Sequence, residues 1–257
     1  MRKLFVLFLT LGIVLMASAV MAGTAPGSGI GGTPHDLSSL GGGVLWGDTA
    51  EQAGLNRICI YCHAPHHTIK PADAATVGVN YVPLWNHALT TTTSWTMYSN
   101  GSEEPSDANH ASYAEANAVE PGGISKLCLS CHDATVATNA YGTAQTCPTS
   151  KGAADKTFVA TNCNVIGYNG DLTNHHPIGF DYAAAQASDD EIEPTTSSLG
   201  AYTIGQLLWY NGSVGADSME CSTCHDVHNS KNTGEKFLWT TEAQSGLCLA
   251  CHLGKNQ

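Results

Sequence analysis

The stretch Cys221-Ser-Thr-Cys-His-Asp-Val-His228 contains two cysteines separated by two residues, with a histidine directly after the second. This C-x-x-C-H pattern is the signature of covalent c-type haem attachment, in which both thiols add to the vinyl groups of one haem. The imidazole of His225 then reaches the haem iron from one face. His228 cannot bind the same iron, because His225 fills that face and the chain is tethered there. The stretch therefore predicts one complete attachment site and a histidine for a neighbouring haem.

Three other C-x-x-C-H motifs lie at residues 59–63, 128–132 and 248–252, so the motifs use eight of the ten cysteines. This predicts four covalently bound haem c groups. A zinc site would pair C-x-x-C units and gives no reason for a histidine after each, and a redox C-x-x-C needs a βαβ pattern that is absent. The predicted attachment residues are Cys59, Cys62, Cys128, Cys131, Cys221, Cys224, Cys248 and Cys251, and the predicted proximal ligands are His63, His132, His225 and His252.

The motifs alternate between two types along the chain. The first and third continue as C-x-x-C-H-x-x-H, which adds His66 and His228. The second and fourth read Leu-Cys-Leu-x-Cys-His and lack the extra histidine. The order indicates two copies of a two-haem unit, joined by linkers of unequal length. A histidine that serves the next haem would force neighbouring haems close together.

The second axial ligand of each iron decides the predicted function. The chain has 12 histidines, four of them proximal, so histidine supply exceeds the need of four irons. Met97 and Met219 are the only internal methionines after residue 22, and Met219 lies too near Cys221 to be a good ligand. Two imidazoles give lower potentials than histidine with methionine, and a six-coordinate iron has no open position for substrate. The sequence therefore favours electron transfer over catalysis, because an enzyme would need one iron left open.

Two histidines outside the motifs are candidate distal ligands. His35 is the one fixed feature of a glycine-rich N-terminal arm, residues 23–45, which would be mobile without an anchor. It could also be a surface side chain. His176 precedes Pro177, which keeps its backbone extended and suits a fixed ligand. The histidines left open as substitutes are His175, His87 and His67.

The N-terminal segment predicts export. Arg2 and Lys3 precede an apolar run from Leu4 to Val20, and a small-residue cleavage site ends at Ala22. Residues 1–22 are therefore predicted to be a secretory signal peptide. A membrane anchor is the alternative, although the run is short for a bilayer span. No later stretch is long and apolar enough to cross a membrane, so the predicted location is extracellular or at the cell surface, with the periplasm as the alternative.

Export also bears on the two cysteines outside the motifs, Cys147 and Cys163, because an oxidising compartment favours pairing. We expect a disulfide between them, worth roughly 3 kcal/mol for a loop of that length, with two free thiols as the alternative. The surface itself is acidic: the net charge of −12 argues against nucleic acid as a partner. Asn100 and Asn211 each begin an Asn-Gly-Ser glycosylation pattern.

Residues 23–257 are predicted to form a single tetrahaem cytochrome c domain with low regular secondary structure. Four haems supply apolar surface that a chain of this size would otherwise take from side chains. We expect mostly coil with short helices at the CxxCH sites and a few short strands, wrapped around a stack of four haems. The β-branched and aromatic content of residues 90–98 predicts a short strand pair that ends at Asn100-Gly101.

The chain carries, in this order, the motifs His35-Asp-Leu-Ser38, Cys59-x-x-Cys-His-Ala-Pro-His66, Pro83-Leu-Trp-Asn86, Leu127-Cys-Leu-Ser-Cys-His-Asp133, His176-Pro-Ile178 with Asp181-Tyr182, and Cys221-x-x-Cys-His-Asp-Val-His228. Through these motifs the chain resembles the extracellular tetrahaem cytochromes of the outer-membrane cytochrome E type, which polymerise into nanowires. The resemblance covers nearly all of the chain after residue 22. It implies bis-histidine haems, with one iron taking a histidine from the adjacent subunit. Carried over, the distal ligands would be His35, His66, His176 and His228.

Three functions follow, in order of preference. The first is an exported tetrahaem cytochrome that polymerises head to tail and conducts electrons between redox cytochromes or to extracellular acceptors. A heterologous contact that does not close yields such a filament, and His35 or His66 would cross the joint. The second is a monomeric periplasmic electron shuttle in which all ligands close within one chain. The third is a multihaem oxidoreductase with one open haem; the first two are electron carriers and not enzymes.

Overall fold

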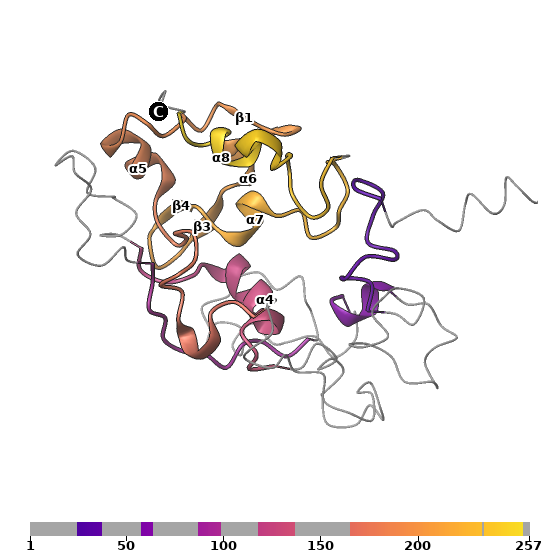
Figure 1. Cartoon of the computed structure of the whole chain (residues 1–257). Coiled ribbons are helices and arrows are strands. Elements are labelled where there is room, and N and C mark those ends of the chain that lie inside the picture. Colours follow the sequence, from indigo (N-terminus) through magenta and orange to yellow (C-terminus); the bar gives the residue numbers. More distant parts are fainter. Residues whose placement is uncertain are drawn as a thin grey trace, which may run out of the picture.

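The computed structural model describes residues 25–37, 58–63, 87–98, 118–136, 165–232 and 234–253. Within these residues the helices and strands are short, and coil connects them (Figure 1). The predicted signal peptide, His66, His67, Cys147 and Cys163 lie outside the described residues. In chain order the elements are η2 (Ile58–Tyr61), α4 (Gly123–His132), η3 (Tyr168–Gly170), α5 (Tyr182–Ser188), β1 (Ser198–Leu199), β2 (Tyr202–Thr203), α6 (Ile204–Leu207), β3 (Trp209–Asn211), β4 (Ala216–Ser218), α7 (Cys221–Cys224), η4 (Ala243–Ser245) and α8 (Gly246–Leu249).

Each of the four C-x-x-C-H motifs carries a short helix, namely η2, α4, α7 and α8. Where the motif histidine follows the end of the helix, its backbone N–H donates to the carbonyl of the first motif cysteine, at 2.7 Å for His63, 3.1 Å for His225 and 2.9 Å for His252. A helical turn therefore brings the histidine onto the side of the chain where the cysteines lie. In the described residues no helix is both long enough and apolar enough to span a membrane.

Two antiparallel hairpins follow one another between α5 and α7. β1 pairs with β2 in the register Leu199↔Tyr202, and β3 pairs with β4 in the register Tyr210↔Asp217. The first hairpin turns at Gly200, whose φ is +63°, and a Cβ atom there would lie 2.0 Å from the carbonyl oxygen of Trp239. Glycine is needed at this turn for both its left-handed backbone and its close approach to another segment.

The buried core lies between these hairpins and α5. Its members are Phe180, Tyr182, Ala185, Leu199, Ile204, Leu207, Met219 and Cys251. The alanine-rich α5 is capped by Asp181, whose carboxylate accepts the backbone N–H of Ala184, and it buries Tyr182 and Ala185 one turn apart. Met219 is 4% exposed within this core, so its thioether packs against side chains.

The prediction of a strand pair near residues 90–98 is wrong for the part of it that the structure describes. Residues 87–98 contain isolated bridge positions and no strand, and Thr96 bridges to the distant Asp171 in parallel. The threonine hydroxyls explain the difference. Those of Thr90 and Thr92 donate to the carboxylate of Asp133, so this segment packs on the second haem motif.

Candidate cofactor site

The second and third motifs lie on helices that pack against each other, α4 and α7 (Figure 1). Their first cysteines meet, because the side chains of Cys128 and Cys221 form a hydrogen bond. Cysteines of consecutive motifs are also neighbours elsewhere: Cys62 interacts electrostatically with Cys131, and Cys224 with Cys251. None of the eight motif cysteines forms a disulfide. All eight thiols are therefore available for thioether bonds, and the four motifs adjoin in chain order.

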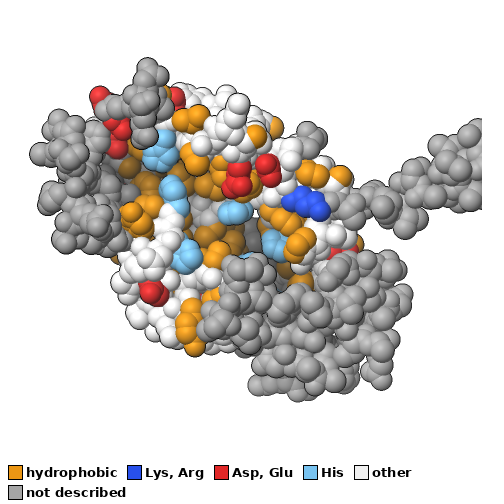
Figure 2. All heavy atoms as spheres, viewed as in Figure 1, with side chains coloured by type: hydrophobic (Ala, Val, Ile, Leu, Met, Phe, Trp, Pro, Cys, Tyr) orange, Lys and Arg blue, Asp and Glu red, His pale blue; other side chains and the backbone are white. Residues whose placement is uncertain are grey.

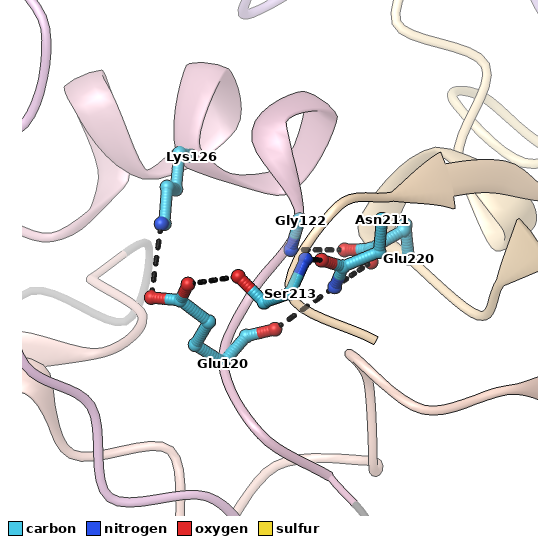
Figure 3. Close-up of polar contacts among 6 residues, drawn as sticks. All are labelled: Glu120, Gly122, Lys126, Asn211, Ser213 and Glu220. Carbon is cyan, nitrogen blue, oxygen red and sulfur yellow. Dashed lines mark hydrogen bonds and ion pairs between the residues drawn. The ribbon is translucent and has the colours of Figure 1, made fainter. Parts of the chain in front are cut away.

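Glu220, which immediately precedes Cys221, joins the two helices through hydrogen bonds of its buried side chain (Figure 3). Its side chain is fully buried and accepts hydrogen bonds from the backbone N–H of Gly122 at 3.0 Å and from the Ser125 hydroxyl, both at the N-terminus of α4. It also accepts the side-chain amide of Asn211 at 3.2 Å. A Cβ atom on Gly122 would lie 2.5 Å from this carboxylate, so glycine is required there. One buried carboxylate thus fixes the spacing of two motifs.

Asn211, which begins one of the two Asn-Gly-Ser patterns, belongs to the same network of hydrogen bonds around Glu220. Asn211 is 2% exposed, and its amide nitrogen donates to the carbonyl of Glu120 and to Glu220 (Figure 3). A glycan needs that nitrogen and an exposed position. The pattern at Asn211 therefore does not mark an exposed acceptor, and Asn100 lies outside the described residues.

Burial raises the pKa of Glu220 above its ordinary value, while hydrogen bonds from Ser125 and Ser218 oppose the shift. Between the ordinary and the raised pKa the folded protein therefore binds more protons than the unfolded chain. The contribution of this group to stability is complete below the ordinary carboxyl pKa of about 4.3 and is lost as pH rises through the raised pKa. We expect E220Q, which cannot titrate, to lack that fall in guanidinium midpoints measured between about pH 4 and pH 8. Parallel pH profiles for the two proteins would contradict this.

Three pairs of histidine rings lie close together, with interplanar angles of 60°, 26° and 62°, and each pair joins one proximal candidate to one distal candidate. A metal–imidazole bond of about 2.0 Å, with about 1.1 Å from nitrogen to ring centre, places two imidazoles on opposite sides of one metal about 6 Å apart. The observed spacings agree with that value. The pairs are His35 and His132 at 6.1 Å, His63 and His228 at 6.0 Å, and His176 and His252 at 6.3 Å between ring centroids.

Backbone carbonyls orient several of these rings through Nδ1. A histidine that binds a metal through Nε2 usually donates its other N–H to a carbonyl or carboxylate, which fixes the tautomer and the ring orientation. Burial and the nearby His132 also lower the pKa of His35 to about 4, so its imidazole is neutral at pH 7, as a metal ligand must be. The Nδ1 contacts join His35 to the oxygen of Val227 (3.4 Å), His176 to that of Pro177 (2.9 Å) and His225 to that of Phe237 (3.1 Å).

The fourth proximal candidate, His225, belongs to no such ring pair within the described residues, and His66 lies outside them. His87, the reserve candidate, is 1% exposed and lies beside the second motif, with Nε2 3.6 Å from the Cys131 sulfur and Nδ1 2.7 Å from the Ala88 oxygen. It therefore contacts an attachment thiol. His175 is partly exposed and His176 is exposed, and the ring that lies 6.3 Å from that of His252 is His176.

The surroundings of the histidines fit a large apolar group. Figure 2 shows histidines spaced along a recessed region whose walls are largely hydrophobic. Large apolar side chains next to the motif histidines are exposed, namely Val227 at 47%, Leu249 at 49% and Leu253 at 46%. These side chains would offer apolar contacts to a porphyrin held by the neighbouring motif histidines. An ion between two opposed imidazoles also needs further donors in the plane between them, which a porphyrin supplies.

Four positioning residues were missed by the sequence interpretation: Asp133, Asp226, Glu220 and Asn229. Asp133 and Asp226 each follow a proximal histidine directly, and both are buried. The Asp226 carboxylate accepts the backbone N–H groups of His228 at 3.1 Å and Ser230 at 2.6 Å. The repeated His-Asp dipeptide was the available signal. Among the described residues, no group of three or more His, Cys, Asp or Glu side chains is arranged to hold a metal ion.

A family model supports the haem interpretation. Residues 214–257 match the family described as "Doubled CXXCH motif" (Paired_CXXCH_1), and this segment contains the third and fourth motifs. The match indicates a multihaem c-type cytochrome with covalently bound haem c and an electron-carrier role. No curated protein and no solved structure matches the chain.

Proposed function

We propose that this protein is an exported tetrahaem c-type cytochrome that conducts electrons through closely spaced bis-histidine haems. The observation that carries the proposal is the set of three facing histidine pairs, each of which contains one motif histidine. In this assignment the attachment cysteines of each motif hold one haem, and the paired imidazoles bind its iron. The haem iron supplies one-electron redox chemistry when bound. His66 is the candidate partner for His225, as the repeated C-x-x-C-H-x-x-H pattern implies.

The protein's part in electron transfer is to place the haems close together and to keep both axial positions filled. The contact between Cys128 and Cys221 brings the second and third haems together, and His228 extends from the third motif to face His63 of the first. Each link joins one motif to another. Filled axial positions exclude substrate from the iron, which favours a carrier over an enzyme.

We further propose that the protein polymerises head to tail into an extracellular filament, with His66 as the ligand that crosses between subunits. His35 is less suited to that role, because it faces His132 of its own chain. The alternative is a monomeric periplasmic shuttle, which gains support from the three pairs that close within one chain. The mass of the purified protein tests the haem number: we expect four covalent haems, and fewer would contradict the proposal.

The size of the native protein then distinguishes the filament from the monomeric shuttle. The filament predicts high-molecular-weight material in the secreted fraction that electron microscopy resolves as a regular polymer, and it predicts that H66A abolishes it. A four-haem monomer at every concentration would support the shuttle instead. Filaments that persist in H66A would exclude His66 as the crossing ligand.

The choice between His176 and His175 has its own test. His176 faces His252, so H176A should leave the fourth haem five-coordinate and move about a quarter of the haem absorbance and electron paramagnetic resonance signal from low spin to high spin. H175A is the matched control, because it removes the adjacent histidine, and it should stay low-spin. A high-spin signal in H175A with none in H176A would reverse the assignment.

A further inference from the structure

The N-terminal arm reaches the second motif by docking on the loop that follows α7 (Figure 1). Nearly all of the backbone hydrogen bonds that hold residues 25–29 converge on one residue, Asn229. Its carbonyl accepts the N–H of Gly29 at 2.8 Å, and its side-chain oxygen accepts the N–H of Gly27 at 3.2 Å. Its amide nitrogen donates to the carbonyls of Ala25 and Gly29, both at 2.9 Å. The carboxamide therefore both accepts from the arm and donates to it.

Asn229 is itself held rigidly. It is 2% exposed, and its backbone N–H donates to the carbonyl of Asp226 at 2.9 Å. Its φ is +50°, in the left-handed region, which asparagine tolerates better than most side chains. The Asp226 carboxylate fixes the same loop by accepting the backbone N–H of Ser230. The anchor of the arm thus belongs to the loop that presents His225 and His228.

The arm leaves this anchor and turns once before it reaches His35. The backbone N–H of Gly32 donates to the Asp36 carboxylate at 2.7 Å, and that of Thr33 to the carbonyl of Ile30 at 2.9 Å. The His35 ring then lies 4.5 Å from that of Phe237 and 6.1 Å from that of His132. These contacts orient the His35 ring, whereas Asn229 holds the backbone of the arm. Without that anchor the glycine-rich arm has few other bonds to the loop.

We propose that Asn229 is the positioning residue that delivers His35 to the iron of the haem attached to Cys128 and Cys131. The inference rests on the proposed function, in which His35 and His132 are the two axial ligands of that haem. It links two haem sites through one side chain: the loop that carries the third motif also holds the distal ligand of the second. Removing the carboxamide leaves His35 in the chain but releases the arm that presents it.

The expected effect is large because the carboxamide makes three hydrogen bonds to the arm. At the usual net strength of such bonds, their loss weakens docking of the arm by about a hundredfold. We therefore expect N229G to show the high-spin signal of the second haem that H35A shows, and added imidazole to return both to low spin. Glycine is the substitute of choice because it accepts the positive φ without strain.

The experiment compares electron paramagnetic resonance and absorbance spectra of haem-loaded N229G, H35A and the double variant, with haem number checked by mass. S230A is the matched control: it changes an exposed neighbour that touches Asp226 but not the arm, and it should stay low-spin. The double variant should match H35A, because Asn229 acts through His35. N229D would set a carboxylate oxygen against the carbonyl oxygens of Ala25 and Gly29 that now accept the amide, so it should also be high-spin, and it serves if N229G does not fold.

Different outcomes overturn different statements. If N229G stays low-spin while H35A does not, Asn229 does not position His35, and the electron-transfer proposal stands. If the double variant has more high-spin haem than H35A, Asn229 acts through another ligand such as His228, and the inference is wrong. If H35A itself stays low-spin, the assignment of His35 as a ligand fails, and with it the inference built on it.

Discussion

Replacing His228 by Ala is expected to leave the haem attached to Cys59 and Cys62 with a single axial ligand. The rings of His63 and His228 lie 6.0 Å apart and 26° from parallel, and in the proposed assignment His228 would provide the second imidazole for that iron. The haem attached to Cys221 should keep His225, which the substitution does not touch. About a quarter of the total haem should therefore change from low spin to high spin, with a rise in the potential of that haem. Electron paramagnetic resonance and potentiometric titration measure both.

The effect should be selective because, in the proposed assignment, the two histidines of one octapeptide would serve different irons. Asp226 keeps the two histidines apart, because its carboxylate accepts the backbone N–H of His228 and the chain turns after His225. V227A is the matched control, because its exposed side chain lies between the two histidines and has no imidazole. It should keep all haems low-spin. Loss of the haem attached to Cys221 in H228A, or a fully low-spin H228A, would contradict the division of roles.

Replacing Glu220 by Ala is expected to lower the free energy of unfolding by about 3–5 kcal/mol. The buried carboxylate receives hydrogen bonds from the Gly122 N–H, the Asn211 amide and two serine hydroxyls. Alanine would leave several of these donors buried without an acceptor, each at a cost of about 1–3 kcal/mol before the structure relaxes. Guanidinium unfolding of the haem-loaded protein, followed by far-UV circular dichroism, measures the loss.

Because of where Glu220 lies, its removal should also change the relative position of the second and third motifs. It ties the N-terminus of α4 to that of α7, and these helices carry the second and third motifs. D217A is the control, because Asp217 is an exposed carboxylate on the neighbouring strand β4; its effect should stay within about 0.5 kcal/mol. Equal effects of E220A and D217A would show that the buried carboxylate does not hold the helices together.

The multihaem class could be predicted from the sequence because its signal is local. Two cysteines, two intervening residues and a histidine suffice to identify an attachment site, and the family match over residues 214–257 indicates the multihaem c-type class. The candidates His35, His176 and His228 also followed from local features. Their pairing did not, because it depends on contacts between segments far apart in the chain. Only the structure shows that His35 faces His132 and that His228 faces His63.

The polar residues that position the histidines could not be predicted from the sequence, for a different reason. Asp, Asn and Glu are usually exposed, so nothing local marks Asn229 or Glu220 as buried. Their burial depends on backbone N–H groups brought to them by distant segments, such as Gly29 and Gly122. The strand prediction at the threonines of residues 90–92 failed for the same reason. β-branched residues favour a strand, but here the buried carboxylate of Asp133 accepts the hydroxyls of Thr90 and Thr92.

The central claim is that opposed histidines from different parts of this chain bind the same irons. An experimental structure of the haem-loaded protein at side-chain resolution tests it most directly. The account predicts one iron between each of the pairs His35 and His132, His63 and His228, and His176 and His252, with both cysteines of every motif bonded to haem. An iron bound by one of these proximal histidines together with a different distal residue would contradict it.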